Sequence, residues 1–300
     1  MEVGMYKKIG FIGLGNMGMP MALNLCKHGY PLYVCSRNNK SQQAILAAGG
    51  GSIESFRRMG QECDIIISIV PSDNEIHALY MGEDGILSNP KEGLVCIDMT
   101  SARGSTKQEI ASYIDHMDLQ VQFIDAPASG GVKGAEDGTL SIMVGCSTQQ
   151  FSEHLALLKV LGTTITHTGN VGSASHIKML NQMLNAANTA IAAEVLCLSR
   201  KLGIDDTILS EVINRSSGGS YVFERNVSKH MMQGTYNPEF KLDLMKKDSS
   251  LFIETAKETR SFIPLASLVH QLYEASSNAG LGEKHYTAIY SWYEKNQKPS

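Results

Sequence analysis

In the first half of the chain, short apolar runs alternate with segments whose apolar residues recur every three or four positions. The runs predict strands and the recurring positions predict helices. This alternation is typical of a parallel sheet with helices on both faces. The expected strands are Ile9–Ile12, Leu32–Cys35, Ile65–Val70, Val95–Ile97, Val121–Ile124, Leu140–Val144 and Thr164–His167, and the expected helices are Met17–His28, Ser41–Ala48, Asn74–Tyr80, Ser105–His116 and Gln149–Leu158.

After residue 168 the pattern is helical only. Large apolar residues recur at steps of three and four from Ile177 to Leu198, which predicts one long helix with this stripe facing the core. Gly203 follows, where helices commonly end. We therefore expect an α/β domain over residues 1–168, an all-α domain over residues 169–300, and a functional cleft between them. The other expected helices are Asp205–Asn214, Tyr221–Met231, Pro238–Lys257, Leu265–Ala279 and Tyr286–Lys295.

Composition narrows the class of protein. The chain has 300 residues, 43% of them hydrophobic, and a formal net charge of -4, which argues against a general binder of nucleic acid or anionic membranes. No apolar run approaches the ~20 residues of a bilayer span, and no signal peptide is evident. The six cysteines are scattered without ligand spacing. We expect buried reduced thiols, a cytoplasmic location and no metal site.

A glycine-rich loop follows the first expected strand and opens the first helix. It fits G-x-G-x-x-G, in which the first glycine allows a tight turn, the second lets a pyrophosphate approach, and the third lets the helix pack. The helix N-terminus offers unpaired N–H groups to phosphates. The context predicts a dinucleotide site, and an ordinary strand-to-helix turn is the alternative. The loop is Gly13, Leu14, Gly15, Asn16, Met17 and Gly18.

The end of the second expected strand indicates which nucleotide binds. NAD sites usually place an acid there, but "YVCSRNNK" has no acid between Tyr33 and Lys40. Arg37 stands in its place, and a guanidinium can pair with a 2′-phosphate. We therefore expect NADP rather than NAD, with a solvated surface arginine as the alternative reading. The ends of two further strands supply candidates for the nicotinamide side that are equally ordinary turn residues: Val70, Pro71, Thr100 and Ser101.

Two segments supply candidates for substrate chemistry. Ser129, Gly130 and Gly131 offer a hydroxyl and consecutive backbone N–H groups, which can hold a carboxylate or form a flexible connector. On the long helix, Lys178 opens a polar line that continues through Asn181, with Gln182 one turn beyond the lysine. Spacing alone does not separate this lysine from two others as the catalyst, namely Lys133 and Lys247.

Four ordered motifs give nearly the whole chain a resemblance to the β-hydroxyacid dehydrogenases. This family includes 3-hydroxyisobutyrate dehydrogenase, tartronate semialdehyde reductase and 2-(hydroxymethyl)glutarate dehydrogenase. The motifs are "GFIGLGNMGMPMALNL", "DAPASGGVKGAEDGTLSIMVG", "GNVGSASHIKMLNQ" and "FKLDLMKKD". The resemblance implies a dinucleotide-binding Rossmann-like domain over 1–168 and a helical substrate and oligomerisation domain over 169–300. It also implies a dimer or tetramer.

The resemblance implies an activity of the EC 1.1.1 type. Members move a hydride between NAD or NADP and a small carboxylic acid, so that a hydroxyl and a carbonyl interconvert. By motif position, the Ser-Gly-Gly loop resembles the one that holds the substrate carboxylate, and Lys178 the catalytic lysine with Asn181 and Gln182 beside it. Lys247 resembles a lysine that reaches the cofactor, and Ser101 falls at the nicotinamide side.

Departures from the family pattern concern the substrate. Gln182 stands where many members have asparagine, and Gly219 where arginine is frequent, which puts the distal contacts of the acid in doubt. Asn181 replaces the histidine of 6-phosphogluconate dehydrogenases, and Lys178 argues against imine reductases. A reductase of imines or sulfonate aldehydes and a non-catalytic dinucleotide sensor stay open as alternatives. The run "SSGGSY" looks closest to the 2-(hydroxymethyl)glutarate type.

Three aromatic residues of the helical domain are candidates for the distal pocket, although aromatic side chains in such domains more often belong to the core. They are Tyr221, Phe223 and Phe240.

Overall fold

The computed structural model describes residues 7–36 and 38–296, and the chain divides into two compact units, Met1–Lys178 and Met179–Ser300. Helix α8 (Ser173–Lys201) continues across the division. Within the described ranges, none of the helices is both long and apolar enough to cross a membrane. The expected domain boundary between residues 168 and 169 stays a prediction.

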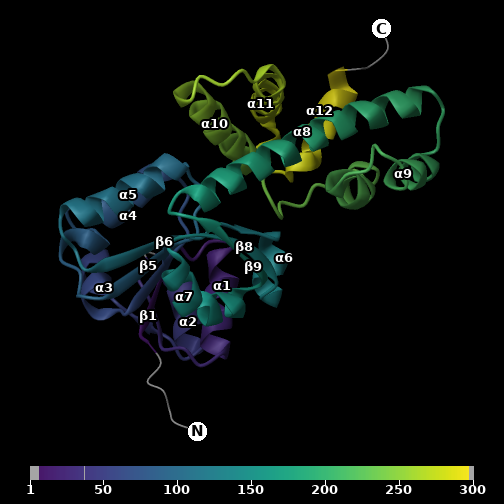
Figure 1. The fold of residues 1–300 in the computed structure, drawn as a ribbon. Helices are drawn as coiled ribbons and strands as arrows, with labels where there is room; N and C mark the ends of the chain where they lie inside the picture. The colour runs from purple at the N-terminus through teal and green to yellow at the C-terminus, as the bar shows by residue number, and fades with distance from the viewer. Residues whose placement is uncertain (1–6, 37, 297–300) are drawn as a thin grey trace. The chain divides into compact units, whose positions relative to one another are not determined.

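The first unit is built on one nine-stranded sheet (Figure 1). Its order is β3-β2-β1-β4-β5-β6-β8-β7, with β9 paired to β8. In this order, neighbouring strands from β3 through β2, β1, β4 and β5 to β6 are parallel. Strand β8 runs antiparallel to β6 and β7. The order 3-2-1-4-5-6 is that of dinucleotide-binding α/β sheets. The strands are β1 (Ile9–Ile12), β2 (Leu32–Val34), β3 (Gly51–Ser52), β4 (Ile65–Ser68), β5 (Leu94–Asp98), β6 (Val121–Asp125), β7 (Ala128–Ser129), β8 (Leu140–Gly145) and β9 (Gly162–Gly169).

Helices cover both faces of this sheet, which explains why its central strands read as unbroken apolar runs. Every residue of β1, β4 and β5 is buried. One apolar cluster joins the sheet to α1 (Gly18–Lys27), α2 (Asn39–Ala47), α6 (Gly131–Asp137) and α7 (Thr148–Leu161). A second cluster joins the other face to α3 (Phe56–Glu62), α4 (Asp73–Met81), η1 (Ile86–Ser88) and α5 (Gly104–His116) (Figure 1).

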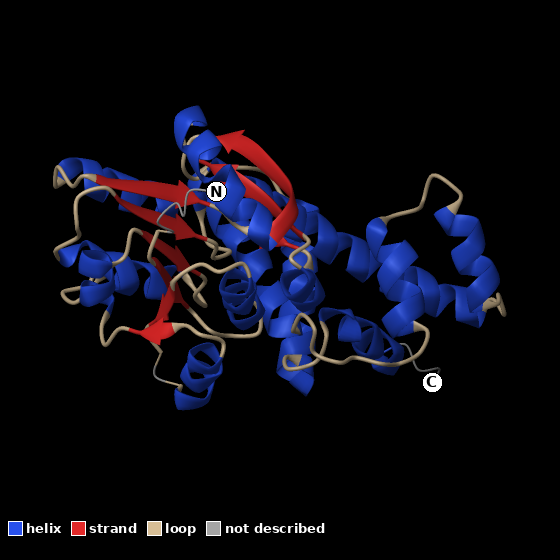
Figure 2. Ribbon diagram, turned by 90° about the horizontal axis from the view of Figure 1, so that it is seen from below, coloured by secondary structure: helices blue, strands red, loops and turns tan. Residues whose placement is uncertain are grey.

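All the named elements of the second unit are helices, joined by turns and loops, and Figure 2 shows them in blue. Its core packs small residues of α8, such as Ala186, Ala190 and Ala193, with Tyr273 and Tyr290 from later helices. The elements after α8 are α9 (Asp206–Asn214), η2 (Phe223–Met231), α10 (Leu242–Glu258), α11 (Pro264–Ser276), η3 (Ser277–Leu281), η4 (Tyr286–Ala288) and α12 (Ile289–Asn296). The expected fold class, an α/β sheet domain followed by helices, is confirmed.

The expected orientation of α8 is wrong. The large apolar side chains of the predicted stripe are 42–65% exposed at Ile177, Leu180, Leu184, Ile191 and Leu198. The core uses the alanines of the opposite face instead. Alanine lets neighbouring helices approach closely but contributes little to a hydrophobic pattern, so the pattern identified the helix correctly and its buried face incorrectly.

Short elements differ most from the sequence-based expectation. Strand β3 has two residues and helix α3 has seven, and neither is long enough to show a period. The glycine-rich segment around Ser129, expected as a loop, contains β7 and α6. The expected end of α8 is confirmed, because Gly203 follows the helix with a left-handed φ of 72°.

Candidate active site

Two glycines of the loop after β1 are required by the packing of the backbone. Gly13 has a φ of 96°, and a Cβ atom there would lie 1.9 Å from the carbonyl oxygen of Ile69. A Cβ atom on Gly18, the first residue of α1, would lie 1.9 Å from the carbonyl oxygen of Gly13. The first and third glycines therefore hold the turn and seat the helix against the strand.

The middle glycine has a different role. A Cβ atom on Gly15 would meet no atom within 4 Å among the described residues outside its immediate chain neighbours. The fold does not require glycine there, whereas close approach of a pyrophosphate to the backbone does. Helix α1 also has no acidic residue in its first turn, so its positive end is available to an anion. The loop fits a dinucleotide, with Leu14, Asn16 and Met17 completing it.

Arg37, the residue expected to select the nucleotide, lies outside the described residues. Strand β2 ends at Val34, and the side chain of Asn38 caps α2 by accepting hydrogen bonds from the backbone N–H groups of Lys40 (3.0 Å) and Ser41 (3.3 Å). In this fold a ribose-reading side chain follows the second strand, and Arg37 does so in the sequence.

The structure brings two of the strand-end candidates together. The backbone N–H of Val70 donates a hydrogen bond to the hydroxyl of Thr100 (3.0 Å), and this hydroxyl donates to Asp98 (3.2 Å). Pro71 is exposed and Ser101 is half-buried. The pair joins the ends of β4 and β5, next to the glycine loop in the sheet order.

A fully buried ionic network lies at the carboxyl ends of β5 and β6. Lys107 of α5 forms an ion pair with Asp98 and lies 3.8 Å from a carboxylate oxygen of Asp125. None of the three residues has measurable exposure. Ser68 donates to Asp98 (2.5 Å) and itself contacts the hydroxyl of Tyr80 (2.6 Å). Burial raises the pKa of Asp125 above its usual value, and Lys107 opposes this effect.

The same network holds the start of α8. Asp125 accepts hydrogen bonds from the backbone N–H and the hydroxyl of Ser175, at 2.9 and 2.7 Å. Lys178 follows three residues later and is buried. The absence of a side chain on Gly104 lets α5 approach the first turn of α8, since a Cβ atom on Gly104 would lie 2.2 Å from the His176 ring. Pattern analysis of the sequence overlooked this network, although its two acids end apolar runs.

The Ser-Gly-Gly segment turns sharply at its two glycines. Gly130 and Gly131 both have left-handed φ angles, 136° and 64°. Ser129 ends β7 and is half-buried, and α6 begins at Gly131. Two successive left-handed residues turn the backbone sharply, which only glycine does readily. Lys133, one of the rival lysines, is 78% exposed and paired with Asp137 at 2.7 Å.

Beyond Lys178, the polar line on α8 continues into the second unit. The side-chain amide of Gln182 donates a hydrogen bond to Asp248 (2.7 Å), and Asn181 donates to the Gln182 oxygen (3.2 Å). Asp248 also pairs with Lys247 at 3.1 Å. Thus Asn181, Gln182 and Lys247, three residues chosen from the sequence, form one hydrogen-bonded group through the buried Asp248.

The aromatic candidates divide between surface and core. Tyr221 is 69% exposed, whereas Phe223 is buried in the core of the second unit. Phe240 packs against that core and makes an edge-on contact with Tyr286. Phe223 and Phe240 therefore serve packing.

Comparisons with known families cover both halves of the chain. Residues 8–169 match the family described as the "NAD binding domain of 6-phosphogluconate dehydrogenase". Residues 172–293 match the family described as "NAD-binding of NADP-dependent 3-hydroxyisobutyrate dehydrogenase".

Individual relatives match over nearly their full length. The 2-(hydroxymethyl)glutarate dehydrogenase of Eubacterium barkeri is 36% identical over 288 residues, which is 96% of this chain and 95% of that protein. The mitochondrial 3-hydroxyisobutyrate dehydrogenase of Homo sapiens is 33% identical over 295 residues, 96% of this chain and 87% of that protein.

Solved structures agree. The Mycobacterium tuberculosis 3-hydroxyisobutyrate dehydrogenase, solved with L-serine, superposes with a TM-score of 0.89 at 26% identity, covering 96% of this chain and 99% of that one. An imine reductase from Myxococcus stipitatus, at 18% identity and a TM-score of 0.64 over 96% of this chain and 100% of that one, shows likeness of fold alone. The chain therefore belongs to the β-hydroxyacid dehydrogenase family and is an oxidoreductase that interconverts a hydroxyl and a carbonyl on a small hydroxy acid with NAD or NADP.

Proposed function

We propose that this protein is an NADP-preferring dehydrogenase or semialdehyde reductase of a small hydroxy acid, with Lys178 as its acid–base group. The observation that carries the proposal is the setting of Lys178 on α8. It lies one turn after Ser175, which Asp125 holds, and one turn before Gln182, which Asp248 holds. Residues four apart share a helix face, so lysine and amide face the same side.

This setting suits acid–base chemistry at a reacting oxygen. NADPH, when bound, supplies the hydride that reduces the carbonyl carbon. As negative charge grows on the carbonyl oxygen, the Lys178 ammonium donates a hydrogen bond and then its proton. In the oxidising direction the neutral amine takes the hydroxyl proton. The Gln182 amide, with its nitrogen committed to Asp248, keeps a fixed orientation beside the lysine.

Removing the lysine tests this role. Lys178→Ala is expected to lower kcat by about 10²–10⁴-fold, the usual contribution of a general acid–base group, while the Kd of NADPH stays within about twofold. Lys133→Ala is the matched control, because its side chain is exposed and paired on its own helix. A Lys178→Ala enzyme that keeps most of its kcat would remove Lys178 from the mechanism.

The proposed NADP preference rests on Arg37 and on the lack of an acid between Tyr33 and Lys40. Arg37→Asp replaces a partner of the 2′-phosphate with a group that repels it and can instead bind a ribose hydroxyl. We expect the ratio of kcat/KM for NADPH to that for NADH to fall by at least tenfold. Equal ratios in the two proteins would show that Arg37 does not select the nucleotide. Lys247→Ala should raise the KM for the cofactor, in line with its proposed role.

The substrate carboxylate is proposed to bind at Ser129, Gly130 and Gly131. The Ser129 hydroxyl and the glycine backbone N–H groups supply donors. The panel in the oxidising direction is 2-(hydroxymethyl)glutarate, 3-hydroxyisobutyrate and L-serine. In the reducing direction it is tartronate semialdehyde and the semialdehydes that correspond to the three hydroxy acids. Ser129→Ala should raise KM for the acid more than it lowers kcat. An unchanged KM would move the carboxylate site elsewhere.

Two other activities would give different outcomes with the same panel. A reductase of imines or sulfonate aldehydes would reduce those compounds and leave every carboxylic acid untouched. A dinucleotide sensor would bind NADPH and turn over nothing. Lys178 argues against an imine reductase and a sensor, and the Ser-Gly-Gly segment argues against a sulfonate-aldehyde reductase.

The exposed stripe on α8 supports a homo-oligomer, either a dimer or a tetramer. Five large apolar side chains along one helix exceed what monomers commonly leave in water. Light scattering after gel filtration tests the assembly, and Leu184→Lys should dissociate it. A wild-type monomer at micromolar concentration would refute it. The proposed cytoplasmic location is supported by six free cysteines.

A further inference from the structure

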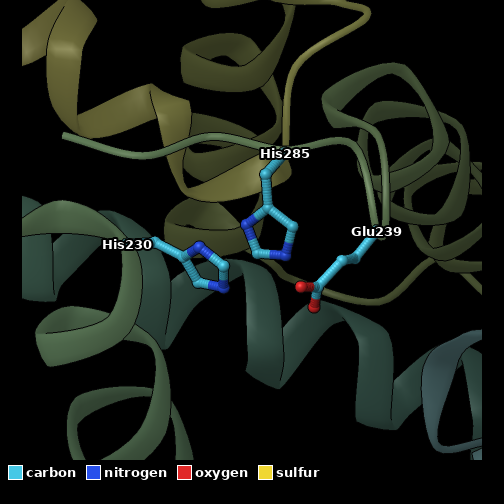
Figure 3. A group of neighbouring side chains, drawn as sticks. All are labelled: His230, Glu239 and His285. Atoms are coloured by element: carbon cyan, nitrogen blue, oxygen red, sulfur yellow. The ribbon is translucent and has the colours of Figure 1, made fainter. Parts of the chain in front are cut away.

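Two histidines and a glutamate of the second unit, none of them assigned a role above, lie close together. They are His230 of η2, Glu239 in the segment before α10, and His285 immediately before η4. One potential ligand atom from each lies within 4.8 Å of the others, and among the described residues no other group of this kind meets the same criterion. Figure 3 shows that each ring turns a nitrogen toward the Glu239 carboxylate.

Backbone hydrogen bonds hold the segments in place. The N–H of His285 donates to the carbonyl of Tyr236 (3.1 Å), and the N–H of Tyr286 donates to Phe240 (2.9 Å). These two bonds bracket Glu239 and fix its segment beside His285. The rings of His230 and His285 are stacked, with centroids 4.1 Å apart. The group is therefore preorganised by its surroundings.

Each histidine has its Nδ1 atom engaged by an outer partner. Nδ1 of His230 lies 3.1 Å from the carbonyl oxygen of Thr235, which can only accept, so Nδ1 carries the hydrogen and Nε2 keeps its lone pair. Nδ1 of His285 lies 2.7 Å from the hydroxyl of Thr287, which can accept or donate, and the backbone N–H of Thr287 donates to the same atom at 3.4 Å. Nε2 keeps its lone pair in the tautomer whose Nδ1–H donates to the hydroxyl. Histidines that bind metals characteristically donate their second ring N–H to such a partner.

We propose that His230, Glu239 and His285 form a binding site for a divalent transition metal ion of the zinc type. Two imidazole nitrogens and one carboxylate oxygen are the protein ligands of one kind of four-coordinate zinc site, in which water takes the fourth position. Ligand atoms around tetrahedral zinc lie roughly 3.3 Å apart, given bonds of about 2.0–2.1 Å. Glu239 is on the surface and its side-chain torsions can close the remaining gap. The inference is independent of the proposed dehydrogenase mechanism.

Lys229 is the competitor for this site. Its ammonium lies 2.9 Å from both oxygens of Glu239. A metal ion must share or displace this partner, so removing the lysine should strengthen metal binding.

Titration of the full-length protein, stripped with a chelator, with Zn²⁺ and Co²⁺ tests the site. Calorimetry should give one ion per chain, and the Co²⁺ complex should show the visible bands of nitrogen and oxygen ligation. Glu239→Gln should weaken Zn²⁺ binding at least as much as loss of an outer partner does, about 10–100-fold. Lys229→Gln should strengthen it. Glu283→Gln is the matched control, since Glu283 is an exposed acid of the same unit paired with Lys241, and it should leave binding unchanged.

His230→Gln provides a second test that keeps a buried polar side chain, and circular dichroism reports whether it folds. It should weaken Zn²⁺ binding by the same order as Glu239→Gln. Three results would overturn the proposal: no Zn²⁺ binding by wild type in the micromolar range, equal affinities in wild type and Glu239→Gln, or Co²⁺ bands of thiolate ligation. The last result would assign the metal to a cysteine. Failure here leaves the Lys178 tests unaffected, because those measure turnover and NADPH binding.

Discussion

Replacing Lys107 by methionine removes a positive charge from the buried network while keeping most of the side-chain volume. Lys107 has no measurable exposure and pairs with Asp98, with Asp125 at 3.8 Å. Neither acid is accessible to solvent. Removing one partner of a buried ion pair leaves an uncompensated charge and commonly costs about 3–5 kcal/mol of folding free energy. For a unit of this size that corresponds to a fall in melting temperature of roughly 6–20 °C.

The loss should depend on pH in a defined direction. Burial already raises the pKa of Asp125, and removing Lys107 raises it further. An acid with a raised pKa in the folded state contributes stability at low pH and loses it as pH rises through that pKa. The deficit of Lys107→Met relative to wild type should therefore be larger at pH 8 than at pH 5.

The assay is denaturant unfolding followed by two probes. The single tryptophan, Trp292, lies in α12 of the second unit, so its fluorescence reports that unit, while circular dichroism reports both. Lys107→Met should shift the circular dichroism transition more than the fluorescence transition. Adding Asp98→Asn should recover more than half of the loss, because a neutral pair replaces an unpaired charge. A cost below about 1 kcal/mol, or no recovery in the double variant, would refute the assignment of Lys107 as the counter-ion.

Three further predictions concern other parts of the first unit. Gly15→Ala should unfold like wild type but bind NADPH at least tenfold more weakly, whereas Gly18→Ala should lower the melting temperature, because only the second Cβ atom meets backbone at 1.9 Å. Burial lowers the pKa of His154, so on acidification the unfolded chain takes up a proton at this residue before the folded chain does. The free energy of unfolding should therefore fall as pH drops below about 6.5. His154→Gln should reduce the difference in unfolding free energy between pH 7.5 and 5.5, and an unchanged difference would contradict this cause. Burial raises the pKa of Cys63 to about 12, so iodoacetamide at pH 8 should leave Cys63 unmodified in the folded protein and alkylate it in urea, as mass spectrometry of the peptides would show.

Much of the first unit could be predicted from the sequence because its central strands are buried on both faces. Strand β1 was predicted with its observed ends, and β4 with two residues too many. Such strands are continuous apolar runs, and a run has visible ends. The strands that were missed have two residues each, β3 and β7. Too few side chains are present there to form a pattern.

The candidate site was predictable where its residues belong to one local motif. The glycine loop and the Lys178 to Gln182 turn are contiguous in the sequence, and family resemblance singled out that lysine. The partners that hold them are not contiguous. Asp125 reaches Ser175, and Gln182 reaches Asp248, through contacts that only the folded chain creates. The same holds for His230 and His285, which lie far apart along the chain, so no ligand spacing indicated a metal site.

The three loop glycines are kept for different reasons, two by the fold and one by the ligand. Gly13 and Gly18 satisfy the backbone of the protein itself, so a descendant that lost its nucleotide would still need both to fold. Only ligand binding requires glycine at position 15, so in such a descendant other residues could replace Gly15 without destabilising the fold. The number of glycines retained in this loop is therefore a poor sign of an active lineage. The identity of the middle residue is the informative one.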